Sequence, residues 1–300
     1  MKQTFWAILA TLFFSLSTPF TKIFADHYPP LFLSAFLYLG SVIGASVGFL
    51  PFLHLMPREK GAFWGRNGLS QTERWALLGS ILIGGVVAPV LLVVGLSRAN
   101  ASEGSLLMNA EGIFTVLIAG ILFRERLSVR LILGTILGAL GCALLSFKGA
   151  GSAGLWSLPF FGAALFWALD TNILRFLVSV NPLVLTVWKG IGSALFLFLL
   201  AGAFERSPEI SLEIVAVLLT GAVGYGASLV FFLRSIARIG VSRTGAWFSF
   251  SPFMGAILSL LILSEPVPAI FPVSFGILLA AAVLLQEKGE KAEGVNGDGA

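Results

Sequence analysis

Charge, cysteine and recognisable catalytic motifs are all scarce in this 300-residue chain. Only 11% of its residues are charged and 57% are hydrophobic, with a mean hydropathy of +0.95, which lies far outside the range of soluble globular proteins. The sole cysteine, Cys142, excludes an intrachain disulfide. The sequence has no nucleotide-binding glycine loop, no G-x-S-x-G elbow and no ligand cluster with metal-like spacing inside its apolar runs. We therefore predict a protein that is not an enzyme and uses no cofactor and no metal.

The charge that is present is weakly basic. The net charge is +4 and the sequence pI is about 9.5. In a soluble protein that balance would suggest nucleic acid, but here it indicates basic loops that face anionic lipid or the cytoplasm. The predicted partners are accordingly the lipid bilayer and a small-molecule substrate, with no nucleic acid.

Apolar runs occupy most of the chain. A bilayer core of about 30 Å needs about 20 apolar residues in each helix that crosses it, and the runs here have that length. They cover residues 4–25, 31–56, 75–97, 101–123, 127–147, 156–178, 182–204, 212–233, 241–263 and 267–286. Their content of Gly, Ala and Ser favours packed helices over barrel strands. The predicted fold is an all-α membrane protein with ten transmembrane helices, the first of them retained and not cleaved as a signal peptide.

The second half of the sequence repeats features of the first. Arg98, Ser102 and Glu125 are each matched by the same residue type 140 positions later. Near the start of each half the offset is 153, since Lys22 and Pro29 are matched by a basic residue and a proline, and a long connection at 57–74 accounts for the difference. We predict two five-helix repeats, 1–147 and 156–286, joined by a linker at 148–155 and followed by a disordered cytoplasmic tail at 287–300.

An odd number of helices in each half inverts the second half in the membrane, as in inverted-repeat transporters. Basic residues agree with one orientation. With the N-terminus inside, fourteen of the nineteen Lys and Arg fall in inner segments and four in outer segments, a strong positive-inside bias. The predicted protein is a multi-pass protein of the cell (plasma or inner) membrane with both termini cytoplasmic.

Three ionisable residues lie well inside the apolar runs: Glu111, Asp170 and Lys189. A charge at the bilayer centre costs about 2.5–3.5 kcal/mol even on permissive scales, so such residues usually face a cavity or a partner. Asp170 and Lys189 lie at similar depths on neighbouring helices, so they form either a structural bridge or part of a substrate site. Glu111 has no evident mate. It is either a functional carboxylate or a neutral acid bonded to a neighbouring helix.

Polar and aromatic residues near these charges are candidates to line a pocket. The candidates are Thr18, Asn172, Trp188, Tyr225 and Ser251. Ser251 occupies the repeat position of Glu111 and precedes a proline, so an opened backbone there would expose carbonyl groups to a cavity. Each of them, taken alone, is equally typical of ordinary helix packing.

The tandem halves, the segment Asn109–Phe123 followed by Glu125, and the second-half pair of Glu265 with Gly276 resemble the EamA family of the drug/metabolite transporter superfamily. Many members have a glycine before the turn glutamate, whereas Arg124 and Ser264 stand there in this chain. The resemblance implies ten helices and a secondary transporter, permease or exporter of a small metabolite. A secondary transporter that works by alternating access is the leading hypothesis, and if protons drive it, Glu111 is the residue predicted to couple them to the substrate. A membrane enzyme or lipid-handling protein with the same cavity, or a non-transporting scaffold, is the alternative.

Overall fold

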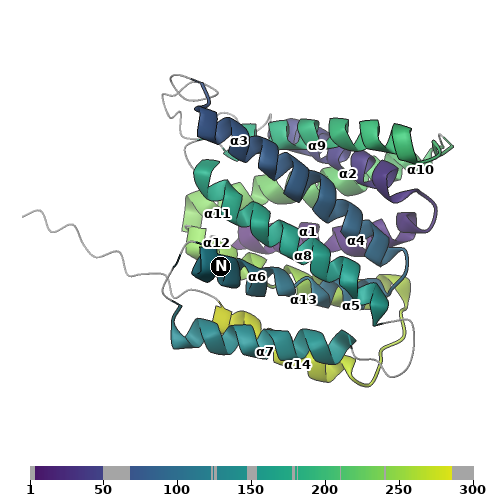
Figure 1. Ribbon diagram of the computed structural model, residues 1–300. Coiled ribbons are helices and arrows are strands. Elements are labelled where there is room, and N and C mark those ends of the chain that lie inside the picture. The colour runs from purple at the N-terminus through teal and green to yellow at the C-terminus, as the bar shows by residue number, and fades with distance from the viewer. Residues whose placement is uncertain are drawn as a thin grey trace, which may run out of the picture.

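The computed structural model is a bundle of helices (Figure 1). It describes residues 4–49, 68–122, 124, 127–146, 154–177, 180, 182–209, 211–239 and 241–285. Within these ranges every regular element is a helix, as the sequence predicted. Glu125, most of the predicted linker 148–155 and the whole of the predicted tail 287–300 lie outside the described residues.

The first half of the chain forms eight helical elements. They are α1 (Phe5–Ala25), α2 (Pro30–Phe49), α3 (Gln71–Ser80), the π-helix η2 (Ile81–Val87), α4 (Ala88–Leu96), α5 (Ala101–Leu107), α6 (Ala110–Leu122) and α7 (Val129–Ser146).

The second half forms ten. They are η3 (Leu155–Ser157), α8 (Leu158–Ile173), η4 (Leu174–Leu177), α9 (Pro182–Phe204), α10 (Glu213–Gly221), the π-helix η5 (Ala222–Ala227), α11 (Ser228–Ile239), α12 (Val241–Phe248), α13 (Ser251–Leu263) and α14 (Phe271–Leu285).

Eight helical stretches in the described part of the chain are long and apolar enough to cross a membrane. They are Phe5–Ala25, Pro30–Val47, Gln71–Leu96, Ala101–Leu122, Val129–Ser146, Leu155–Leu177, Val184–Phe204 and Glu213–Phe232. Two shorter apolar helices, α13 and α14, follow. Large apolar side chains also point outward, with Ile121, Leu199 and Leu261 each more than 60% exposed, as a lipid-facing surface requires. The chain is a multi-pass helical membrane protein.

Long helix pairs set the shape of the bundle. In Figure 1, α7 and α14 lie side by side along one edge, and α2 and α9 lie together along the opposite edge. Between these edges, α1 packs on α11 and α13, while α8 packs on α4 and α6. Each of these contacts joins an element of the first predicted repeat to an element of the second.

The two π-helices occupy matching places in the two halves, since η5 begins and ends 140 positions after Leu82 and Val87 of η2. A glycine in each one meets a side chain of the other half. A Cβ built on Gly84 would fall inside the Asp170 carboxylate, and one on Gly224 would lie 2.7 Å from the Cβ of Ser17. Asp170 and Ser17 are themselves related by the 153-residue offset. The same close approach is thus made once in each predicted half, where a glycine is required.

The two residues that stand in place of glycine before the turn glutamates adopt the left-handed backbone conformation. Arg124 has φ 53° and Ser264, which ends α13, has φ 51°. This conformation costs a side-chain-bearing residue about 1–2 kcal/mol, and helices commonly end in it with glycine. Arg124 and Ser264, which replace the glycine of the family pattern, therefore each have a strained backbone.

Ser264→Gly is expected to raise the free energy of unfolding by about 0.5–1 kcal/mol, because relief of the strain exceeds the extra chain entropy that glycine gives the unfolded state. Thermal unfolding in detergent measures the change. Ser264→Ala serves as the control, since alanine keeps the strained φ and should give no gain. Equal effects of the two substitutions would contradict this explanation.

Candidate functional site

An ion pair lies in the interior of the bundle. The Asp170 carboxylate on α8 is 5% exposed and accepts hydrogen bonds from the Lys189 ammonium on α9 and from the Ser80 hydroxyl at the end of α3, the latter at 2.5 Å. Three separate spans therefore meet at one carboxylate. Both oxygens of this buried carboxylate are therefore hydrogen-bonded, one to an ammonium group and one to a hydroxyl.

The π-helix beside the pair gives the carboxylate its space. Gly84 in η2 has no side chain, and the Asp170 carboxylate lies where a Cβ would be. The Gly84 carbonyl accepts hydrogen bonds from the Tyr38 hydroxyl at 3.1 Å and from the Trp167 indole N–H at 3.0 Å. π-Helical turns are frequent at functional sites because they re-aim backbone groups. Here the turn holds two aromatic side chains against the ion pair.

Glu111 joins this cluster. It is partly buried at the start of α6, within hydrogen-bonding reach of the Thr171 hydroxyl and close enough to Asp170 and Lys189 to interact with both charges. Thr171 itself is exposed, so the cluster extends from the buried ion pair to the surface of the bundle. The structure thus brings the three ionisable residues singled out in the sequence into one site. It also supplies neighbours for Glu111 that the sequence did not reveal.

The other residues predicted to line the site do not all lie at the ion pair. The Tyr225 ring stacks on Tyr38 with centroids 6.3 Å apart, which connects it to the ion pair. Trp188, one residue before Lys189, is 42% exposed. Asn172 is buried and its amide group donates to the Ala168 carbonyl of its own helix at 2.8 Å. Thr18 is half-buried on α1. Nothing ties Thr18 or Asn172 directly to the charged cluster.

Ser251 lies beside an interrupted helix. The chain makes a turn at Ser249–Phe250 between α12 and α13, and the Ser251 carbonyl accepts a hydrogen bond from the Ser15 hydroxyl at 2.9 Å. The next carbonyl, of Pro252, accepts one from the Ser105 hydroxyl at 2.9 Å. Both carbonyls thus bind neighbouring helices, and a role for Ser251 in lining a cavity stays a prediction.

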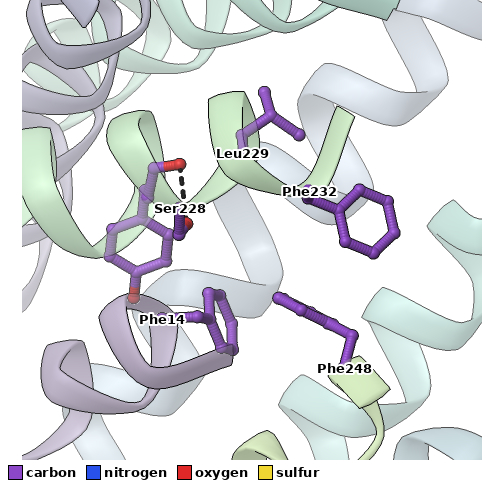
Figure 2. A pocket seen from close by; sticks show the side chains of 6 residues that line it. Phe14, Ser228, Leu229, Phe232 and Phe248 are labelled. Atoms are coloured by element: carbon purple, nitrogen blue, oxygen red, sulfur yellow. Dashed lines mark hydrogen bonds between the residues drawn. The ribbon is translucent and has the colours of Figure 1, made fainter. Parts of the chain in front are cut away.

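A small aromatic cavity opens near Tyr225 (Figure 2). It has a volume of about 170 Å³ and lies between α1, the η5–α11 span and α12. Ser228, Leu229 and Phe232 line it from α11, and the rings of Phe14 and Phe248 face them from α1 and α12. Tyr225 of η5 completes the lining. Tyr225 belongs both to this cavity and to the stack on Tyr38, whose hydroxyl donates to Gly84 beside the ion pair.

The sequence did not identify Ser80, Tyr38, Trp167 or Gly84 as part of the site. One signal was available, because glycines recur in the two matched spans, Gly84 with Gly85 and Gly224 with Gly226. Glycine within an apolar helix commonly marks a close approach of another chain segment. Which side chain approaches it is set by the packing of helices far apart in the sequence.

Fold and site together define a multi-pass helical membrane protein with a buried charged site between its helices. The model of the EamA-like transporter family matches residues 1–147 and again residues 154–286. The chain belongs to the EamA-like transporter family. The family points to a transporter rather than an enzyme, with a small-molecule substrate and the bilayer as partners.

Two curated relatives carry transporter names. An "Uncharacterized transporter" of Methanothermobacter thermautotrophicus is 30% identical over 299 residues, covering 94% of this chain and 85% of the relative. "Uncharacterized transporter YyaM" of Bacillus subtilis is 26% identical over 223 residues, covering 70% and 71%. A solved structure described only as "Crystal structure of protein" superposes with a TM-score of 0.64 at 18% identity, covering 95% of this chain and 98% of that one. That likeness concerns the fold alone.

Proposed function

We propose that this protein is a secondary transporter that moves a small, charged metabolite by alternating access, with the Asp170–Lys189–Glu111 cluster as its substrate and coupling site. The observation that carries the proposal is the buried ion pair with Glu111 beside it. Charges inside a membrane span are costly and usually mark a substrate or ion pathway. A pair that served packing alone would not require a third ionisable group within electrostatic reach.

A charged substrate can exchange its own groups for the ion-pair partners within the cluster. Lys189 donates to an anionic group, and Asp170 or Glu111 accepts from a cationic group, so a substrate that carries both charges can bind both members of the pair without leaving a charge unpaired. Tyr38, Trp167 and the aromatic cavity supply apolar surface for the remainder of the molecule. Because each substrate charge is paired with an opposite charge of the cluster, the substrate can occupy the low-dielectric interior of the bundle.

We further propose ten membrane-spanning helices in two inverted five-helix repeats, with both termini on the cytoplasmic side of the plasma membrane. Three features support the repeat: the π-helices at the same offset, the matched glycine contacts at Gly84 and Gly224, and a family model that aligns twice. The orientation is supported by the distribution of Lys and Arg.

Single cysteines in a Cys142→Ala background test the topology. Gln71→Cys, exposed at the first turn of α3, should react with a membrane-impermeant thiol reagent only after cells are permeabilised. Ser207→Cys, exposed between α9 and α10, should react in intact cells. Labelling of the Gln71 position in sealed cells would reverse the orientation or change the number of spans.

Transport itself is tested with purified protein in liposomes. Candidate amino acids, amines, organic anions and nucleosides are first ranked by the rise in unfolding temperature that each causes, because a ligand that binds only the folded state stabilises it. The best of them is then followed in counterflow, where labelled solute accumulates against excess unlabelled solute inside. Lys189→Met should abolish both the stabilisation and the counterflow. A ligand that stabilises the protein but is chemically altered and not moved would identify a membrane enzyme instead.

A further inference from the structure

The two predicted repeats are packed differently at the two ends of the bundle. In the proposed topology, α5 begins at the outer end and α12, its repeat mate, begins at the inner end. Ser105 of α5 is buried, and its hydroxyl donates to the Pro252 carbonyl of α13. Gly245, which is the repeat mate of Ser105, has no atom of the described residues within 4 Å of a Cβ built on it. The α5–α13 contact is closed, whereas among the described residues no contact is made at Gly245, the matching position of the inner end.

A second pair of helices shows the same difference. At the outer end α10 packs directly on α2, so that a Cβ on Gly40 or Gly221 would fall on the backbone of Leu218 or Leu37. At the inner end the repeat mate of α2, α9, meets the α3–η2 span through side chains, as where a Cβ on Gly192 would lie 2.6 Å from the side chain of Ile81, the first residue of η2. For each described glycine of α3 and α9, the atoms nearest to an added Cβ include no backbone atom of the other of these two helices.

The aromatic cavity is a third difference. Its lining residues Phe14, Ser228, Leu229, Phe232 and Phe248 correspond, by the two offsets, to residues on the outer half of the bundle. Those counterparts are Trp167, Ala88, Pro89, Leu92 and Met108. Ala88, Pro89 and Leu92 are buried, and Trp167 and Met108 pack against the same core cluster as Leu92. The same repeat positions therefore form a cavity towards the inside and solid core towards the outside.

One carboxylate holds the outer contact together. Glu265, in the connection after α13, accepts hydrogen bonds from the backbone N–H groups of Ala101 at 2.6 Å and Ser102 at 2.9 Å, the first residues of α5. Both carboxylate oxygens are used, and they bind a helix N-terminus, where the dipole favours negative charge. This contact of the two Glu265 oxygens with two backbone N–H groups, here called the Glu265 fork, joins the second repeat to the first. Breaking it leaves two N–H groups at the start of a buried helix without their acceptors.

We propose that the structure is the inward-facing state and that the Glu265 fork on Ala101 and Ser102 is a latch that keeps the outer gate, α5 against α13, closed. This inference rests on the proposed transport function and topology. Access from outside requires the latch to open and α12 to close on α6 at the inner end. Glu265 touches no candidate substrate group, so it acts on the equilibrium between the two states and not on binding.

The test measures the reactivity of two cysteines in the Cys142→Ala protein, reconstituted without substrate. Ser105→Cys reports the outer gate and Gly245→Cys, its repeat mate, reports the inner gate. In the otherwise native protein, a membrane-impermeant thiol reagent should label the Gly245 position from inside and leave the Ser105 position protected. Glu265→Gln should raise the outside labelling rate at Ser105 by about tenfold or more, because hydrogen bonds to a charged group are lost. It should lower the inside rate at Gly245.

Glu209→Gln, which neutralises an exposed carboxylate in the outer connection before α10, is the matched control and should change neither rate. Glu265→Asp, which keeps the charge but shortens the reach, provides a second variant if Glu265→Gln does not fold. Unchanged labelling rates in folded variants would contradict the latch. A higher labelling rate at both the Ser105 and the Gly245 positions would also contradict it, because it would indicate a general loosening of the bundle. Reciprocal changes in a protein that moves no solute would support the gate and contradict the transport proposal.

Discussion

Asp170→Asn or Lys189→Met alone is expected to lower the free energy of unfolding by about 3–5 kcal/mol, because each leaves the opposite charge buried without its partner. The Asp170 and Lys189 side chains are 7% and 17% exposed, so water cannot compensate. The double change Asp170→Asn with Lys189→Met should recover much of the loss, since no charge is then stranded. Thermal unfolding and yield in detergent measure all three variants.

An exposed ion pair in the same chain provides the control. Lys22 and Asp26 lie 3.4 Å apart at the end of α1 with side chains 20% and 53% exposed. Pairs of this kind contribute at most about 1 kcal/mol, so Asp26→Asn should have a small effect. Strictly additive losses at Asp170 and Lys189 would mean that the two residues do not stabilise each other. Ser80→Ala should cost less than either, because the ion pair remains.

The helices and the depth of the charged residues could be predicted from the sequence. Apolar runs bound the spans because the bilayer requires a fixed length of apolar helix, and counting along them places Asp170 and Lys189 at matching depth. Counting does not give the rotation of a helix or its neighbours. This is why Glu111 seemed to have no mate, although it lies close to Thr171, Asp170 and Lys189.

The π-helices and the residues around them could not be predicted in the same way. A π-turn differs from an α-turn only by a hydrogen bond shifted one residue, and no local pattern in Ile81–Val87 demands it. It is stabilised by partners from elsewhere in the chain, with Tyr38 and Trp167 both donating to Gly84. The recurrence of glycine at the same repeat positions indicated a close approach there. It did not indicate that a carboxylate would fill the space.

In the proposed transport mechanism, proton coupling is assigned to Glu111 and not to its neighbours. Asp170 is held by Lys189 and Ser80, so its charge is already compensated. Glu111 has a hydroxyl within reach and both a positive and a negative charge nearby, so small changes in its surroundings decide whether it holds a proton. A carboxylate with these properties can release a proton as substrate binds and take one up from the other side.

Glu111→Gln is therefore expected to abolish accumulation driven by a pH gradient while leaving counterflow exchange of the same solute in place. Glutamine keeps the shape and leaves the Thr171 hydroxyl within reach but cannot titrate, so exchange should also lose its dependence on pH near neutrality. Glu103→Gln, at the buried start of the same span, is the control and should retain pH-driven accumulation. The pseudo-symmetric Ser251 cannot carry a proton in this way, so a single residue is left for the role. Full pH-driven transport by Glu111→Gln would move the coupling to Asp170, where removal of the charge also breaks the ion pair.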